Sequence, residues 1–316
     1  MNLPFAAVEA RAPGKIILAG EHAVVYGRPA LAVPVFGVQA RVRVTPAPQA
    51  WVQAPAVHLD AALADLPATH PLRQAVERTW AALAMPPRPA RVHIASTIPV
   101  AAGLGSGAAV TVAIVRALAA FAGRVLPPEQ VNALAYAVEK LHHGTPSGID
   151  NTVITYGRPL VYRKGAGWEL LQVARPVPLV IADTGHPAAT RDMVAGVRTR
   201  WQAARDRYEA LFDAIAEAVA AARHALAVGD LPALGRALCD NQRLLQAIGV
   251  SSPALDALVD AALAAGAYGA KLSGAGGGGN MLAVTPPEGQ AAVAQALRAA
   301  GAARVIVTTL PPTEAA

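Results

Sequence analysis

A glycine-rich stretch, Pro99–Ala109 (PVAAGLGSGAA), constrains the fold of this chain more than any other feature of its sequence. Before it, Ala90–Ser96 alternates apolar and polar side chains, as a half-buried strand does. After it, Ser106–Ala122 has helical composition. Glycine allows tight turns and close approach to a ligand, and the free amides at a helix start attract anions. The stretch therefore predicts a phosphate-binding loop, with a flexible strand-to-helix connection as the alternative.

This stretch does not fit either of the standard nucleotide-binding loops. The spacing of Gly103, Gly105 and Gly107 differs from the GxGxxG pattern of dinucleotide-binding folds. A Walker loop has a lysine directly after its last glycine, and this stretch has none. We therefore expect a phosphate loop of another kind.

A second glycine-rich stretch, Lys271–Asn280 (KLSGAGGGGN), lies between the strand-like segments Ala270–Ser273 and Asn280–Val284. Consecutive glycines cost conformational entropy on folding, and a hairpin turn needs only about one or two of them. The pattern therefore predicts that the backbone here closely approaches a ligand or another loop.

Charged residues gather around a third glycine-containing segment, Ala12–Gly27 (APGKIILAGEHAVVYG), where Lys15, Glu21 and His22 flank an apolar strand. Each of these residues alone is usually a surface residue. Their concentration beside the glycines favours a functional site.

The segment Glu139–Asn151 (EKLHHGTPSGIDN) has a similar character. Glu139 lies near the end of a predicted helix, and Asp150 lies just past a glycine-containing turn. Glu139 and His143 share a helix face, which raises a zinc site as an alternative, but no suitably spaced third histidine or cysteine is present. Plain helix capping by Ser147 or Asp150 is the other alternative.

The composition favours a globular protein built largely from alanine-rich helices. Hydrophobic residues make up 54% of the 316 residues and aromatic residues only 4%. The formal charge is 27 − 21 = +6, but the basic residues are scattered, so we expect a small anionic substrate and no nucleic acid.

The single cysteine, Cys239, excludes an intrachain disulfide. No signal peptide is predicted, because the N-terminus lacks a charged segment followed by an apolar one. No membrane span is predicted, because the uncharged run Val92–Val115 is broken by glycine and proline, and a cytoplasmic location is expected.

The pattern of apolar residues predicts alternating strands and helices. Strands are predicted over Ile16–Leu18, Val38–Thr45, Ala90–Ser96, Thr152–Tyr156, Leu160–Tyr162, Leu179–Ala182, Ala270–Ser273, Asn280–Val284 and Arg304–Thr308. Helices are predicted over Pro71–Ala84, Ser106–Ala122, Pro127–Leu141, Ala188–Val228 with an interruption at Gly196, Leu231–Ile248, Pro253–Ala265 and Gln290–Ala300. The segment Arg163–Pro178 has few large apolar residues, so we expect a boundary there, between domains 1–175 and 176–316.

These stretches together resemble the motifs of the GHMP kinases, a family of small-molecule kinases. PVAAGLGSGAA resembles the phosphate-binding loop of that family, and KLSGAGGGGN resembles its C-terminal glycine motif. APGKIILAGEHAVVYG and HGTPSGIDN resemble the N-terminal motif and the catalytic segment of the members that phosphorylate mevalonate. The resemblance covers nearly the whole chain, and the motifs occur in the family's order.

The resemblance implies an α+β, two-domain GHMP kinase fold. The N-terminal domain would be ribosomal S5 domain 2-like and would bind ATP, and the C-terminal domain would be ferredoxin-like. The implied cofactors are ATP and Mg²⁺. The implied reaction is phosphorylation of the 5-hydroxyl of (R)-mevalonate in isoprenoid biosynthesis. The sequence leaves the oligomeric state open, with a homodimer as one option.

The resemblance also implies roles for individual residues. Asp150 would accept or orient the proton of the substrate hydroxyl, and Lys15 would keep Asp150 ionised and offset charge at the reacting oxygen. Glu139 and Ser106 would bind the metal. The ATP phosphates would lie against Pro99, Ala102, Gly103, Leu104, Gly105, Ser106, Gly107 and Ala108. The substrate would lie near Glu21, His22, His143, Gly144, Ser147 and Thr190.

One departure from the family pattern lies in the phosphate loop, where Gly107 replaces the usual second serine. One hydroxyl is thereby lost, and Ser106 or a water would serve instead. Two other functions stay open at this point. The chain could phosphorylate another small alcohol, such as phosphomevalonate or a sugar, or it could be a nucleotide-binding regulator without catalysis.

Overall fold

The protein divides into two compact units, each formed from two stretches of the chain. The computed structural model describes residues 7–100, 102–143, 147–187 and 190–313. The first unit contains Met1–Gly14 and Val38–Gly157, and the second contains Lys15–Gly37 and Arg158–Ala316. The expected division into 1–175 and 176–316 stays a proposal. The segment with Lys15, Glu21 and His22 belongs to the second unit.

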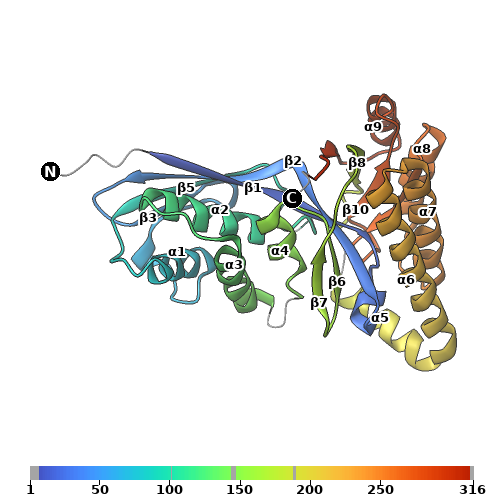
Figure 1. The fold of residues 1–316 in the computed structure, drawn as a ribbon, viewed down its shortest axis with the longest axis horizontal. Coiled ribbons are helices and arrows are strands. Elements are labelled where there is room, and N and C mark those ends of the chain that lie inside the picture. The colour runs from blue at the N-terminus through green and yellow to red at the C-terminus, as the bar shows by residue number, and fades with distance from the viewer. Residues whose placement is uncertain (1–6, 101, 144–146, 188–189, 314–316) are drawn as a thin grey trace. The chain divides into compact units, whose positions relative to one another are not determined.

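The first unit combines strands with a layer of helices (Figure 1). Its strands are β1 (Val8–Ala19, in part), β2 (Pro29–Pro46, in part), β3 (Trp51–Ala54), β4 (Leu59–Ala62) and β5 (Ala90–Ser96). Its α-helices are α1 (Pro71–Ala82), α2 (Ser106–Phe121), α3 (Pro128–His143) and α4 (Ile149–Tyr156), and its short 3-10 helices are Pro55–Val57 and Leu63–Asp65. Residues Ala40–Pro46 of β2 pair antiparallel with β5, which pairs parallel with β3. Helix α2 buries 11 of its 16 residues and contacts α1, α3 and α4.

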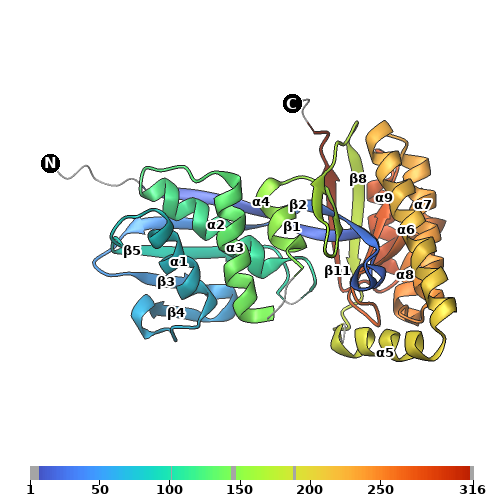
Figure 2. The same ribbon diagram turned by 60° about the horizontal axis from the view of Figure 1, so that its bottom comes forward.

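The second unit carries a four-stranded sheet covered by helices on one face (Figure 2). The strands of this sheet are β8 (Val177–Asp183), β9 (Gly269–Ser273), β10 (Asn280–Val284) and β11 (Arg304–Leu310). The unit also contains β6 (Leu160–Arg163) and β7 (Gly167–Leu170), which pair with each other and lie outside this sheet. Its α-helices are α5 (Thr190–Ala203), α6 (Arg205–Val228), α7 (Leu231–Ala247), α8 (Pro253–Ala264) and α9 (Gln290–Ala299), and Ala23–Tyr26 forms a short 3-10 helix. The sheet order is β11-β8-β10-β9, and every pairing is antiparallel. This is the strand order of a ferredoxin-like fold, so the expected fold class is confirmed.

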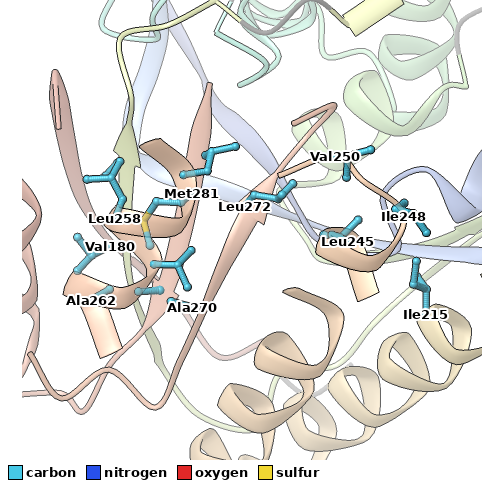
Figure 3. Packing of buried hydrophobic residues seen from close by; sticks show 14 of the residues in the cluster. Val180, Ile215, Leu245, Ile248, Val250, Leu258, Ala262, Ala270, Leu272 and Met281 are labelled. Atoms are coloured by element: carbon cyan, nitrogen blue, oxygen red, sulfur yellow. The ribbon is translucent and has the colours of Figure 1, made fainter. Parts of the chain in front are cut away.

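The core of the second unit lies between its sheet and its helices (Figure 3). Leu272 of β9 and Met281 of β10 are fully buried there, together with Val180 of β8 and Leu245 of α7. Strands β9 and β10 are buried along their whole length. A strand buried on both faces can read as a continuous apolar run, as Met281–Val284 of β10 does, whereas β9 also buries Lys271 and Ser273.

Three local predictions were wrong. Thr152–Tyr156, predicted as a strand from its β-branched residues, belongs to α4, because packing against α2 and α3 overrides weak β-propensity. The long helix breaks at Ala204, whose φ is −142°, and not at Gly196, which lies inside α5. The region between Thr45 and Pro71, for which no strand is predicted, contains β3 and β4.

Candidate functional site

The first glycine-rich loop connects β5 to α2 in the first unit, as predicted. Gly103 and Gly105 both have φ of 73°, a conformation that side chains disfavour. Gly105 precedes the first turn of α2, and no side chain caps that turn. The first amides of a helix have no intrahelical acceptor, so this helix start offers donors for an anion. Leu104 is buried and anchors the loop.

The remaining loop residues differ in exposure. Pro99, Ala102 and Ser106 are half-buried, Gly107 is exposed, and Ala108 is buried. A Cβ atom added at Gly107 would meet no atom within 4 Å. The missing second serine therefore does not reflect a lack of space. The assignment of these residues to ATP stays a proposal.

Glu139 and Asp150 lie in consecutive helices of the first unit and are linked through Asn151. One end of the Asn151 amide lies 3.0 Å from Glu139 Oε2 and 3.0 Å from the Gly148 carbonyl oxygen. A carboxylate and a carbonyl only accept hydrogen bonds, so the Asn151 amide donates to both oxygens when its NH₂ group lies at this end. Asn151 is 2% exposed, and the other end of its amide lies 2.6 Å from Asn132 Oδ1 of α3, so the amide is held between the two helices. The sequence predicts no role for Asn151.

Asp150 occupies the first turn of α4, directly before Asn151. Helix α4 begins after Gly148, whose φ of 82° allows the sharp turn into the helix. A carboxylate is stabilised near a helix N-terminus by the backbone dipoles. Asp150 is therefore placed at the N-terminal end of α4, one residue before Asn151.

The predicted substrate residues are spread over both units. Ser147 is exposed, and its Oγ accepts a hydrogen bond from the Ile149 amide at 3.3 Å, which gives the capping interpretation some support. Thr190 is the first residue of α5 and is exposed. Gly144 and the side chain of His143 lie outside the described residues.

Lys15, Glu21 and His22 are all buried polar residues of the second unit, at 8%, 4% and 6% exposure. The Glu21 carboxylate forms a buried ion pair with Lys271, the residue that begins the second glycine motif. His22 Nε2 donates to the Ala275 carbonyl oxygen at 2.8 Å, so this nitrogen carries the imidazole proton. The third and second motifs of the sequence therefore meet within one unit.

Burial is the largest influence on the pKa values of Glu21, Lys271 and His22. It raises the pKa of the Glu21 carboxyl, and the Lys271 ammonium opposes the shift. Burial also lowers the pKa of Lys271, and Glu21 opposes that shift. The pKa of His22 is lowered by burial, with smaller contributions from the charges of Arg200 and Lys271. His22 is therefore held as the neutral imidazole.

The second glycine-rich loop is packed against other loops of its own unit. A Cβ atom at Gly276 would lie 1.9 Å from the Val250 carbonyl oxygen, and one at Gly278 would lie 2.6 Å from that of His186. At Gly277 it would lie 2.9 Å from Met193 Sδ of α5. Close approach to another loop, one of the two predicted explanations, is thus confirmed for these glycines.

The residues of the first unit suit a magnesium ion held jointly with phosphates. In the described part of the chain, no three histidine, cysteine, aspartate or glutamate side chains converge to hold a metal. Mg²⁺ commonly takes only one or two protein carboxylates, with phosphate oxygens and water completing the shell. The carboxylate of Glu139 and the hydroxyl of Ser106 are oxygen donors of that kind.

Within the described ranges, no helix combines the length and the apolar character that a membrane crossing requires.

The chain is an α+β protein of two units with a glycine loop that opens a helix, an arrangement that suits anion binding. Comparison with known proteins identifies the group. The family model for the GHMP kinases N terminal domain matches residues 71–158, and that for GHMP kinases C terminal matches residues 207–303. The chain belongs to the GHMP kinase family.

Similar proteins cover nearly the whole chain. A mevalonate kinase of Thermococcus sibiricus is 37% identical, covering 95% of each chain. A mevalonate kinase of Pyrococcus horikoshii is 35% identical, covering 93% of each chain. The crystal structure of L. major mevalonate kinase in complex with R-mevalonate is similar with a TM-score of 0.84 and 29% identity, covering 100% of both chains.

Proposed function

We propose that this protein phosphorylates the 5-hydroxyl of (R)-mevalonate with ATP, giving 5-phosphomevalonate and ADP. The observation that carries the proposal is the similarity to proteins named mevalonate kinase, at 37% identity over 95% of the chain. The resemblance of the N-terminal motif and of HGTPSGIDN points to the same subfamily. A galactokinase and a phosphomevalonate kinase share the fold at 17% and 18% identity, which supports the fold alone.

In this proposal, Asp150 accepts the proton of the substrate hydroxyl or orients that hydroxyl for attack. Lys15 offsets negative charge that develops during transfer. Phosphoryl transfer depends mainly on positioning and charge stabilisation. The first turn of α4, which carries Asp150, and the Asn151 amide, which lies beside the Glu139 carboxylate, supply the positioning within the first unit.

The family implies the use of ATP, and we propose Mg²⁺ as its companion ion. When bound, Mg²⁺ neutralises charge on the phosphates and orients them. Glu139 and Ser106 would hold it, and the backbone amides at the start of α2 would bind phosphate oxygens. A cytoplasmic location and a homodimer stay predictions, the latter to be tested by light scattering.

The experiment that tests the proposed function is ADP release from Mg-ATP with a panel of acceptors. The panel contains mevalonate, phosphomevalonate, galactose, homoserine and a sample without acceptor. We expect release with mevalonate alone. Release with a different acceptor would overturn the substrate assignment and leave the kinase class intact. ATP binding without release in any sample would favour the non-catalytic regulator.

A further inference from the structure

The backbone at His22 adopts a conformation that residues with side chains rarely take. Its φ is 61° and its ψ is −51°. The Ala23 amide donates to the Glu21 carbonyl oxygen at 2.7 Å, which closes a three-residue turn with His22 at its centre. A turn with these angles is the strained form of the γ-turn. Such strain persists only where surrounding contacts hold it, and it gathers at functional sites.

Each residue around this turn is held by a contact to a distant part of the second unit. The Gly20 amide donates to Asn241 Oδ1 at 3.2 Å. The Glu21 carboxylate is paired with the Lys271 ammonium, and His22 Nε2 donates to the Ala275 carbonyl oxygen. The strained turn is therefore held on three consecutive residues.

The contacts form one buried polar network based on α7 and β9. Asn241, which holds Gly20, is followed by Gln242, whose Oε1 accepts from the Leu272 amide at 2.8 Å. Gln242 is itself fixed, because its Nε2 donates to Asp256 Oδ1 at 3.1 Å. Two adjacent side chains of one helix thus fix both the strained turn and the strand that carries Lys271.

The burial of Lys271 is difficult to explain by stability alone. Its side chain is 0% exposed and that of Glu21 is 2% exposed. Desolvation of two charges offsets much of their attraction, and apolar side chains of similar volume often stabilise a fold as well or better. Besides Glu21, the Lys271 ammonium contacts the Leu272 carbonyl oxygen, so its position is fixed from two sides.

We propose that Lys271 is a positioning residue for the acceptor alcohol, acting through Glu21 on the strained turn that presents His22. Glu21 then serves the site through this ion pair and not by touching the substrate. This inference rests on the proposed function. It concerns the second unit only, since the phosphate loop, Glu139 and Asp150 belong to the first. Loss of Lys271 should therefore affect mevalonate more than ATP.

The test is a comparison of steady-state constants for Lys271→Met and for the wild-type chain, with (R)-mevalonate and Mg-ATP varied in turn. We expect the KM for mevalonate to rise at least about tenfold, while the KM for ATP stays within about twofold. Asn241→Ala, which removes only the acceptor for the Gly20 amide, should give the same split with a smaller rise. If Lys271→Met does not fold, Glu21→Gln is the decisive variant, because it replaces the ion pair by a neutral partner for Lys271 and should give the same split.

A matched control separates positioning from general loss of stability. Val259→Ala removes buried volume from α8 in the same core, outside the polar network. It should lower the melting temperature and leave both KM values unchanged. Three results for Lys271→Met would overturn the inference. The KM values for mevalonate and ATP could change equally, neither could change, or both could match those of Val259→Ala.

The two proposals fail in different ways. If the wild-type chain phosphorylates a different alcohol, the proposed substrate is wrong, and the same KM comparison with that alcohol decides the role of Lys271. If the wild-type chain phosphorylates no acceptor on the panel, both proposals fall.

Discussion

The two glycine-rich loops look alike in sequence but have different physical reasons for their glycines. In the first loop, Gly103 and Gly105 supply positive φ before a helix, and the space beside Gly107 is open. In the second, the glycines of 276–278 are needed because neighbouring backbone and Met193 leave no room for a Cβ atom. One loop is suited to receive a ligand, whereas the other is part of the packing of its unit. Changes in the first region should therefore alter turnover, and changes in the second should alter stability first.

The largest effect is expected in the first unit, at Asp150. Asp150→Asn should lower kcat by about 10²–10⁴-fold, because a general base contributes roughly that factor. Nucleotide affinity and the free energy of unfolding should stay close to the wild-type values. Stopped-flow turnover, ATP-analogue titration and urea unfolding measure the three quantities. Near-normal turnover would remove Asp150 from the mechanism.

The next effect should appear in the second loop, as a loss of stability. Gly276→Ala places a Cβ atom 1.9 Å from the Val250 carbonyl oxygen at a φ of +79°. Overpacking costs about 1–3 kcal/mol and left-handed backbone costs about 1–2 kcal/mol for a residue with a side chain. The free energy of unfolding should fall by about 3 kcal/mol or more in a urea titration.

Gly274→Ala is the matched control for this change. Gly274 has a φ of +98°, but a Cβ atom there would meet nothing within 4 Å. It should therefore show the backbone cost without the packing cost. Equal losses in the two variants would mean that packing does not explain the second loop.

The sequence was sufficient for features whose cause is local. The anion-binding geometry of the first loop follows from glycines placed between a strand and a helix. The ferredoxin-like sheet follows from fully apolar runs such as Leu179–Ala182. The position of Glu139 near the end of a helix was also predicted. The first-turn position of Asp150 was not, because Thr152–Tyr156 was predicted to be a strand and not the helix that Asp150 opens.

The features that the sequence did not reveal depend on contacts between distant residues. Asn241 and Gln242 look like ordinary polar residues of a helix, because their partners at Gly20 and Leu272 lie far away in the chain. The strained turn at His22 has no glycine to mark it. One signal in the sequence could have indicated the network. Asn241 and Gln242 lie on the same helix face as apolar residues such as Leu238 and Leu245, and buried polar side chains need hydrogen-bond partners.

A moderate effect on turnover is expected from Ser106→Ala. This change removes the hydroxyl that we assign to the metal and phosphates, while the amides at the start of α2 remain. The loss should be about tenfold in kcat/KM for ATP, equivalent to about 1.4 kcal/mol of transition-state stabilisation. Unfolding should not change. An unchanged rate at saturating and limiting ATP would transfer the role to the backbone amides and water.

A smaller effect is expected on the pH dependence of stability, through His22, which donates to the Ala275 carbonyl oxygen of the second loop. The pKa of His22 is lowered in the folded protein from an ordinary value of 6.5, mainly by burial. Below pH 6.5 the His22 imidazole binds a proton in the unfolded chain more readily than in the folded protein. The free energy of unfolding should therefore decrease as the pH falls below 6.5, and the contribution of His22 should be complete above that pH. His22→Gln retains a donor for the Ala275 carbonyl oxygen but cannot titrate.

The measurement is the melting temperature between pH 5 and pH 8 for both proteins, at about constant ionic strength. The wild-type curve should descend more steeply toward acid than the His22→Gln curve. Parallel curves would show that another group accounts for the acid sensitivity.

The smallest effect, and the most direct test of the open first loop, is expected from Gly107→Ser. The added side chain would meet no atom within 4 Å, and the residue lies in the first turn of α2, where serine is well tolerated. Stability should stay within about 0.5 kcal/mol of the wild type, as for an exposed substitution without special contacts. Turnover should be equal or higher, since the change restores the second hydroxyl of the family loop. In the double variant Ser106→Ala/Gly107→Ser, recovery of part of the lost kcat/KM for ATP would show that either hydroxyl can serve the phosphates. No recovery would assign that role to Ser106 alone, while a marked loss of stability in Gly107→Ser would contradict the open geometry that separates this loop from the packed one.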